Sequence, residues 1–233
     1  MKGQPWINRP SAATEPTLRR RGFLVGMALL GCSLLGSRQA RAITLDQALD
    51  RITAARATIK TLQANFGQTR QIGLLAAEVE SKGAMTMVRP DRLRWELKPP
   101  DSVTYWIGPE GFAMATADGV VKVGAAAAGK FGAVLGDIMI MLGGDLRKLR
   151  ERYELDASEV AGRLALVAKP RQDTNPEVHK HLSALRLEFG AELWMVAHMV
   201  IEERNGDRST IVFDTPKRDV PVPPETMKPP AKR

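Results

Sequence analysis

Two alternating histidines are the best candidates for metal chemistry in this chain of 233 residues. His179 and His181 are one residue apart, so on a β-strand both imidazoles would share a face and could ligate zinc. A catalytic zinc ion usually needs a third protein ligand, and His198 is distant in sequence. We therefore interpret the pair as part of a solvated loop before residue 182, and we predict no metal and no cofactor.

Three acidic residues lie beside predicted turns, where carboxylates cap and solvate the chain: Asp101, Glu110 and Asp118. The chain has no Gly-x-Ser-x-Gly nucleophile elbow, no phosphate-binding glycine loop and no paired acids in a recognisable setting. We predict that the protein is not an enzyme. A secreted hydrolase stays open as an alternative, which a polar cluster inside the fold would favour.

The most informative pattern is an alternation of apolar residues across residues 83–98. Period-two alternation is typical of half-buried strands, and Pro90 suits the second position of a tight turn between them. Paired strands would place five large apolar side chains on one concave surface: Met85, Met87, Leu93, Trp95 and Leu97.

An apolar surface of this kind has two interpretations. Methionine is flexible and polarizable, so a surface that contains two of them adapts to irregular apolar ligands. Stripes of this type are nevertheless more often sealed core, and the residues alone favour that interpretation. A further alternation follows, in which Val103, Tyr105 and Ile107 alternate with Thr104 and Trp106.

The elements that would position this surface can be read from the flanking sequence. Thr44 and Gln47 form a capping box, which predicts an amphipathic helix over residues 45–61 with its apolar stripe on the sheet. Short strands joined by tight turns follow, which favours an antiparallel meander. The predicted strands cover residues 66–73, 83–98 as a hairpin, 103–107, 112–114 and 120–123.

The second half of the chain predicts another set of strands. Residues 124–136 are typical of a loop or weak helix, residues 138–142 of a strand or buried helix, and residues 145–152 of a surface helix. Asn205–Gly206 is a favoured hairpin turn. The predicted strands cover residues 153–155, 163–169, 182–189, 194–202 and 208–213. The tail from Pro216 holds six of the fifteen prolines, which predicts extended or disordered chain.

The net charge of +8 does not indicate a nucleic-acid partner. Residues 1–42 contain seven Lys or Arg and a single acid, Glu15, so the remainder is close to neutral. A nucleic-acid-binding domain would need a basic face. A hydrophobic content of 44% and a charged content of 26% fit one soluble globular domain.

The N-terminal segment has the features of an export signal. Arg20 and Arg21 precede an apolar run at residues 23–35, which is shorter than the ~20 residues of a membrane span. Ala40 and Ala42 suit a signal peptidase, and the arginine pair resembles the twin-arginine motif. Both twin-arginine and Sec export stay open. We expect a signal at residues 1–42, a domain at 43–215 and a Pro-rich tail at 216–233, with the domain in the periplasm.

Cys32 is the single cysteine and leaves a second processing route open. Residues 29–32 resemble a lipobox, in which the cysteine is acylated and the protein is anchored to a membrane through Cys32. We favour cleavage after Ala42, because the apolar run continues past the cysteine. A mature domain without cysteine has no disulfide and no thiol chemistry.

The order of these features resembles the LolA family, the periplasmic carriers of outer-membrane lipoproteins. The matching segments span residues 45–123 most clearly, and residues 153–233 less clearly. They are Phe66-Gly67-Gln68, residues 83–90, Leu93-Arg94-Trp95, Pro100 and the turn at 108–111.

The resemblance implies an α+β fold, an incomplete (open) antiparallel β-barrel whose apolar concave face is lidded by helices. It implies that Phe66 and the apolar positions from Met85 to Ile107 line a lipid cavity, and that Arg89 controls the lid. Arg56 departs from the family pattern, which usually has a large apolar residue in that helix.

The resemblance also implies the partners. These are lipoprotein acyl chains, an inner-membrane lipoprotein-releasing transporter and an outer-membrane acceptor, with the carrier itself a monomer. The alternatives within the same architecture are a membrane-tethered, LolB-like acceptor and a glycolipid-binding or envelope-sensing module.

Overall fold

The first helix begins at the predicted capping box. In the computed structural model, which describes residues 43–73, 77–124 and 129–230, α1 spans Leu45–Arg56. The Thr44 hydroxyl accepts from the Gln47 amide, and the Gln47 side chain accepts from the Thr44 amide. The helix ends five residues before the predicted end at residue 61, because Thr61 already pairs with Val88 in the sheet.

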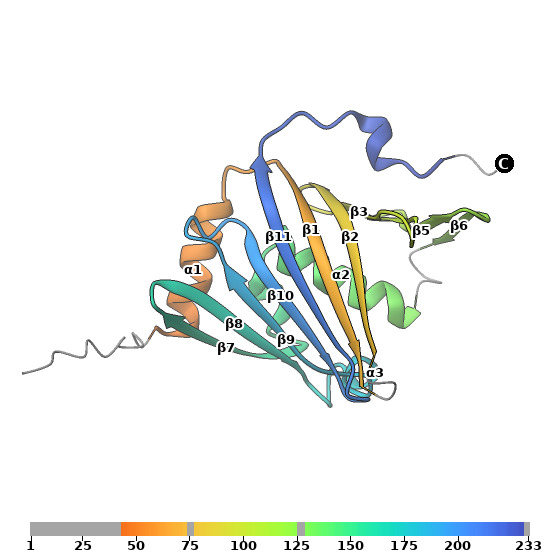
Figure 1. The fold of residues 1–233 in the computed structure, drawn as a ribbon. Coiled ribbons are helices and arrows are strands. Elements are labelled where there is room, and N and C mark those ends of the chain that lie inside the picture. The colour runs from red at the N-terminus through yellow and green to blue at the C-terminus, as the bar shows by residue number, and fades with distance from the viewer. Residues whose placement is uncertain (1–42, 74–76, 125–128, 231–233) are drawn as a thin grey trace, which may run out of the picture. The chain divides into compact units, whose positions relative to one another are not determined.

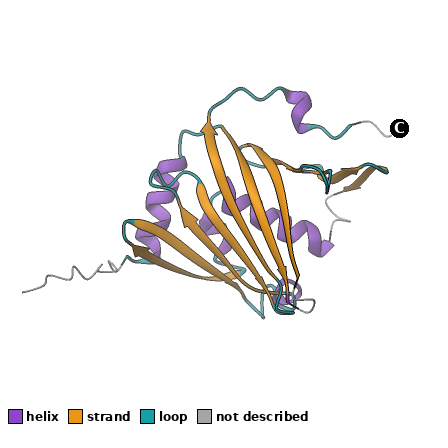
Figure 2. Cartoon of the chain, viewed as in Figure 1, coloured by secondary structure: helices purple, strands orange, loops and turns teal. Residues whose placement is uncertain are grey.

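In the described ranges, eleven antiparallel strands form a single sheet. Figures 1 and 2 show how the strands and helices are arranged. The first six are β1 (Thr61–Ile72), β2 (Ala77–Val88), β3 (Arg92–Leu97), β4 (Val103–Gly108), β5 (Gly111–Thr116) and β6 (Gly119–Gly124). The other five are β7 (Tyr153–Val160), β8 (Arg163–Pro170), β9 (Leu182–Phe189), β10 (Val196–Glu203) and β11 (Arg208–Arg218).

The sheet is an open barrel, as predicted. Its order is β6-β5-β4-β3-β2-β1-β11-β10-β9-β8-β7, so each half is a meander and β1 pairs with β11 where the halves meet. The end strands β6 and β7 do not pair with each other. Closure would have removed these edges, so the incomplete antiparallel barrel is confirmed.

Two helices lie in the described part of the chain between the two meanders. α2 spans Gly129–Gly143, so the apolar run at residues 138–142 is a helix and not a strand. A 3₁₀ helix, η3 (Leu146–Leu149), follows within the predicted surface helix at residues 145–152, and its two leucines are buried. The short helix α3 (Pro176–His179) joins β8 to β9. None of the described helices is long and apolar enough to cross a membrane.

The predicted tail is ordered where it leaves the sheet. β11 runs to Arg218, past the expected boundary at 215/216. The Asp219 carboxylate accepts from the Lys60 amide at 2.7 Å, and the Val220 carbonyl accepts from the Thr61 hydroxyl at 2.7 Å. A final 3₁₀ helix, η4 (Pro224–Met227), comes before the end. Of the two forms expected for the tail, extended or disordered, the segment up to η4 has the extended one, and hydrogen bonds to Lys60 and Thr61 hold its start. The leader and Cys32 lie outside the described residues.

Candidate apolar binding site

Strand register brings the predicted lining residues into rows on one face. The hairpin pairs Met85 with Trp95 and Met87 with Leu93. β4 continues both rows, since Tyr105 faces Trp95 and Ile107 faces Leu93. A third row contains Phe66 on β1, then Gly83, Leu97 and Val103 on β2, β3 and β4. β5 extends the face with Met114 opposite Tyr105 and Phe112 opposite Ile107. We call this set of rows the apolar strip.

The apolar strip has two zones that differ in burial. The inner zone is sealed, with exposed fractions of 0–2% for Phe66, Met85, Met87 and Leu93. The outer zone is half-buried and consists of Trp95, Leu97, Val103, Tyr105 and Ile107. An apolar surface therefore runs continuously from the core to a region that solvent reaches.

An aromatic cluster marks the boundary between the zones. The Phe66 and Trp95 rings stack with centroids 4.0 Å apart, and Phe213 meets Trp95 edge-on at 6.0 Å. Gly83 makes this stack possible, because an added Cβ would lie 2.1 Å from Cζ of Phe66 and 2.3 Å from the Glu96 carbonyl oxygen. Phe66 and Gly83 pair directly in the register of β1 and β2, so the ring lies over the glycine.

Tyr105 and Phe112 carry the aromatic surface into the outer zone. Their rings stack with centroids 5.8 Å apart. Burial, and secondarily Asp101, raises the pKa of Tyr105, so its hydroxyl stays neutral near pH 7. Further along this face, Val121 on β6 pairs with Met114 on β5 and is 52% exposed. The outer zone is neutral and apolar, as contact with a hydrocarbon chain requires.

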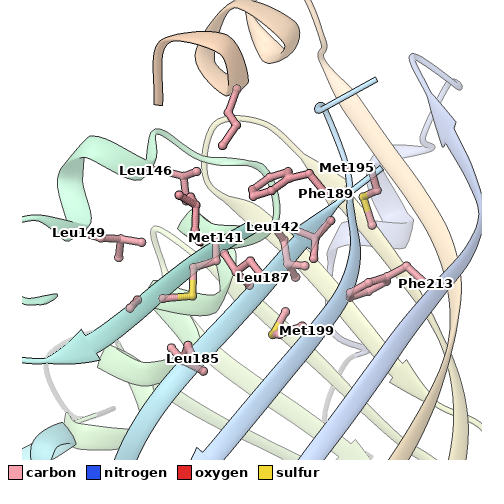
Figure 3. Packing of buried hydrophobic residues seen from close by; sticks show 14 of the residues in the cluster. Met141, Leu142, Leu146, Leu149, Leu185, Leu187, Phe189, Met195, Met199 and Phe213 are labelled. Atoms are coloured by element: carbon pink, nitrogen blue, oxygen red, sulfur yellow. The ribbon is translucent and has the colours of Figure 1, made fainter. Parts of the chain in front are cut away.

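The end of α2 covers the inner zone. Met141 and Leu142 are fully buried, and Figure 3 shows them facing Leu187, Met199 and other side chains of the sheet. A Cβ at Gly143 would lie 2.1 Å from Sδ of Met87, so the helix end approaches β2 closely. The end of α2 therefore closes the inner zone on the Met87 side.

Arg56 holds the end of α2 in place. It is 1% exposed, and its guanidinium donates to main-chain carbonyls of Met141 at 3.0 Å, Leu142 at 3.1 Å and Gly144 at 3.1 Å, and to that of Trp194 at 3.1 Å. The negative end of the α2 dipole stabilises this cation. Desolvation, and secondarily Arg89, lowers the pKa of Arg56 to about 9, so it remains charged at neutral pH.

Arg89 binds the end of α1 in the same way. Its guanidinium donates to the main-chain carbonyls of Arg56 and, at 3.0 Å, of Ile59. Burial lowers the pKa of Arg89. The two arginines therefore act in series: Arg89 binds the carboxyl end of α1, and the last residue of α1 binds the carboxyl end of α2.

A buried polar group gives α2 a second attachment. Asp137 is fully buried, accepts from the Tyr153 hydroxyl at 2.6 Å and forms an ion pair with Arg152. Desolvation raises the pKa of Asp137, opposed by the Tyr153 hydrogen bond and by Arg152. Burial also raises the pKa of Tyr153. This group links the middle of α2 to β7, at the edge of the sheet.

The C-terminal segment lies against β4, on the face of the sheet opposite to the apolar strip. Trp106 alternates with the strip residues and is 9% exposed, and its indole N–H donates to the Thr226 carbonyl at 3.1 Å. A groove of ≈ 530 Å³ lies on this face, with Trp106, Lys122 and Met227 in its lining. Its lining also includes Ile107 and Phe112, so the groove reaches two residues of the apolar strip on β4 and β5.

The side chains first considered for chemistry are dispersed. His179 ends α3, with Nε2 2.8 Å from a guanidinium nitrogen of Arg204. Asp101 accepts from the Ser81 hydroxyl at 2.6 Å, and Glu110 pairs with Arg92. Within the described ranges no group of three or more His, Cys, Asp or Glu residues could hold a metal ion.

Fold and site together define a class of protein: an open antiparallel sheet with an apolar face that helices cover. A family model described as "Outer membrane lipoprotein carrier protein LolA" matches residues 57–108, which run from the end of α1 through β4. An outer-membrane lipoprotein carrier protein from Pseudomonas fluorescens (strain Pf0-1) is 28% identical over 185 residues, covering 78% of this chain and 84% of the relative. The resemblance to the LolA family is thereby confirmed.

Two solved structures are also similar at low identity. A LolA superfamily protein from Nitrosomonas europaea matches with a TM-score of 0.43 and 8% identity, covering 81% of this chain and 99% of that one. The MucA/MucB complex of Pseudomonas aeruginosa matches with a TM-score of 0.43 and 14% identity. There the match covers 78% of this chain and 60% of the solved chain.

Sequence reasoning missed two groups that position α2. Arg56 was noted as a departure from the family pattern, but its partners lie 85–138 residues away in sequence. Asp137 was not considered, although a single acid within an apolar helix is a usable signal for a buried polar contact. Phe213, which completes the aromatic cluster, also comes from a distant strand.

Proposed function

We propose that this protein is a periplasmic carrier that holds the acyl chains of lipoproteins against the apolar strip and shuttles them from the inner to the outer membrane. The observation that carries the proposal is the continuity of the strip from the sealed inner zone to the half-buried outer zone on one face of an open sheet. The family match and the name of the Pseudomonas relative support the choice of lipoproteins as cargo.

The physical need for such a carrier follows from the cost of exposing acyl chains to water. Each CH₂ group costs about 0.8 kcal/mol, so one chain costs on the order of 10 kcal/mol. The outer zone can take the first part of a chain, and displacement of the α2 end would uncover the inner zone for the rest. Binding and release need no covalent step, in agreement with the predicted absence of enzymatic activity.

In this proposal the site residues have two roles. The lining is formed by Phe66, Met85, Met87, Leu93, Trp95, Leu97, Val103, Tyr105 and Ile107. Arg89 stabilises the closed position of the helices through α1. The carrier is a monomer that receives cargo from an inner-membrane transporter and passes it to an outer-membrane acceptor.

The experiment mixes the purified protein with a detergent-solubilised inner-membrane lipoprotein and removes the detergent. A soluble one-to-one complex is expected. Tyr105→Lys places a charge in the outer zone and should prevent the complex, whereas Thr104→Lys is the matched control, because Thr104 lies on the other face opposite Glu96. Absence of a complex with the unaltered protein contradicts the proposal.

The lipobox-like sequence at Cys32 favours one second candidate, a membrane-tethered acceptor similar to LolB. Mass spectrometry of the mature protein from its host separates the two. An N-terminus at Ile43 supports the mobile carrier, and an acylated N-terminal cysteine supports the acceptor.

A further inference from the structure

Arg56 is a buried cation whose acceptors are all neutral. Its guanidinium is bound by four main-chain carbonyls, three of them at the end of α2. The face of the Phe189 ring lies 5.6 Å from Cζ of Arg56. A guanidinium in such an apolar place is stable only while acceptors surround it.

Neither Arg56 nor Arg89 forms an ion pair with any acid in the described part of the chain. Nε of Arg89 is buried and has no hydrogen-bond partner within that part. Two neighbouring cations are thus compensated by the partial charges of helix carboxyl ends.

The acceptors of Arg56 belong to the segment that covers the inner zone. Gly143, between two of these acceptors in sequence, lies against Met87 and Leu62. A ligand that enters the inner zone must displace this segment, and the displacement removes three of the four acceptors. The space then opened contains an uncompensated cation.

We propose that the inner zone selects amphiphiles that carry an anionic group beside the acyl chain, and that Arg56 binds this group in place of the α2 carbonyls. The chemistry is that of a carboxylate or a phosphate, either of which accepts two parallel hydrogen bonds from a guanidinium. A neutral amphiphile offers no such compensation, so it can enter the inner zone but binds there more weakly. This inference rests on the proposed function, since it names the chemical class of ligand for the same site.

The test compares ligands that differ only in charge. Full-length, delipidated protein is titrated with brominated stearate and with brominated stearyl alcohol, and binding is followed by quenching of tryptophan fluorescence. Brominated phosphatidic acid and brominated diacylglycerol form the second pair. The anionic member should bind at least about tenfold tighter, as expected for loss of hydrogen bonds to a charged group. A preference in one pair only identifies carboxylate or phosphate as the source.

Arg56→Met should bind both members of each pair alike, because the cation is gone and the volume is kept. Arg51→Met is the matched control on α1, since Arg51 is exposed and pairs with Glu159, and it should keep the preference. ¹⁵N NMR of the arginine Nε signals gives a test that does not depend on folding of the variant. The Arg56 signal should shift with the anionic ligand and not with the neutral one.

Equal affinity for charged and neutral ligands overturns this inference and leaves the carrier function standing. A preference that survives in folded Arg56→Met, or an Arg56 signal that is insensitive to the anionic ligand, also overturns it. Failure of all four ligands to bind contradicts the proposed function itself, and this inference with it.

Discussion

Arg89 donates a hydrogen bond from its guanidinium to the main-chain carbonyl of Arg56, the residue whose own side chain binds the end of α2. Arg89 therefore connects the sheet to α1, and Arg56 connects α1 to α2. A change at Arg89 acts on α1 directly and on α2 through Arg56. The closed arrangement depends on a small number of charged hydrogen bonds, which a ligand can compete with.

We predict that Arg89→Leu keeps the fold but retains cargo too tightly. The variant loses the hydrogen bonds to Arg56 and Ile59, which stabilise the closed, cargo-free state. A loss of about 2 kcal/mol would slow release about thirtyfold. The measurement is the rate of lipoprotein transfer from the purified complex to acceptor vesicles. Arg92→Leu, at an exposed pair with Glu110, is the control, and release at the unaltered rate in Arg89→Leu would contradict the assignment.

We predict that Gly83→Ala destabilises the protein by about 1–3 kcal/mol, the usual range for overpacking. The added methyl would collide with the Phe66 ring and with the Glu96 carbonyl oxygen. Glu96 lies on β3, which is paired with β2 and β4, so a shift of its backbone would disturb both pairings. Urea denaturation measures the free energy of unfolding. Gly67→Ala on the neighbouring strand is the matched control, because its Cβ would meet nothing within 4 Å. Equal stability of the two variants would show that the Phe66–Trp95 stack is not tightly held.

We predict that acyl chains lie beside Trp95 and not beside Trp106. Trp95 is on the apolar strip, whereas Trp106 is on the opposite face under the C-terminal segment. Two proteins are compared, each with one of these tryptophans and with the other three replaced by phenylalanine. Brominated fatty acid should quench Trp95 strongly and Trp106 weakly. Stronger quenching of Trp106 than of Trp95 would place the ligand in the groove lined by Trp106 and Met227.

We predict a pH dependence of stability that comes from Asp137. Burial raises its pKa above the ordinary 3.8, so the folded state binds the proton more tightly than the unfolded state. The stabilisation by this proton is complete below 3.8 and is lost as the pH rises through the raised pKa. Asp137→Asn does not titrate, so the unaltered protein should lose stability relative to this variant as the pH rises from 3.8 through the raised pKa. A difference in unfolding free energy that is independent of pH would contradict the raised pKa.

Local patterns predicted the parts of the fold in which neighbours along the chain decide the outcome. The alternation at residues 83–98 defines a hairpin whose inward residues are those expected, because strand periodicity is a backbone property. The capping box located the start of α1 for the same reason. The end of α1 was missed because pairing between Thr61 and Val88 overrides helical spacing.

The apolar run at residues 138–142 shows the limit of local reasoning. Its composition is compatible with a strand or a helix, and the structure has a helix. Arg56, Asp137 and Tyr153 make the contacts that favour this choice, and all three lie outside the run. The tail was likewise predicted from its prolines alone, whereas hydrogen bonds to Thr61 and Trp106 hold it on the sheet.

The amino-acid sequence by itself determined the alternating strands, the capped first helix, the set of apolar side chains on one face and the family resemblance. These follow from backbone periodicity and side-chain type over short distances. Only the tertiary structure decided which part of that face is sealed, which part solvent reaches, and that Arg56 closes the end of α2. The reason is physical: burial and the compensation of a buried charge depend on groups that the chain brings together from more than eighty residues away.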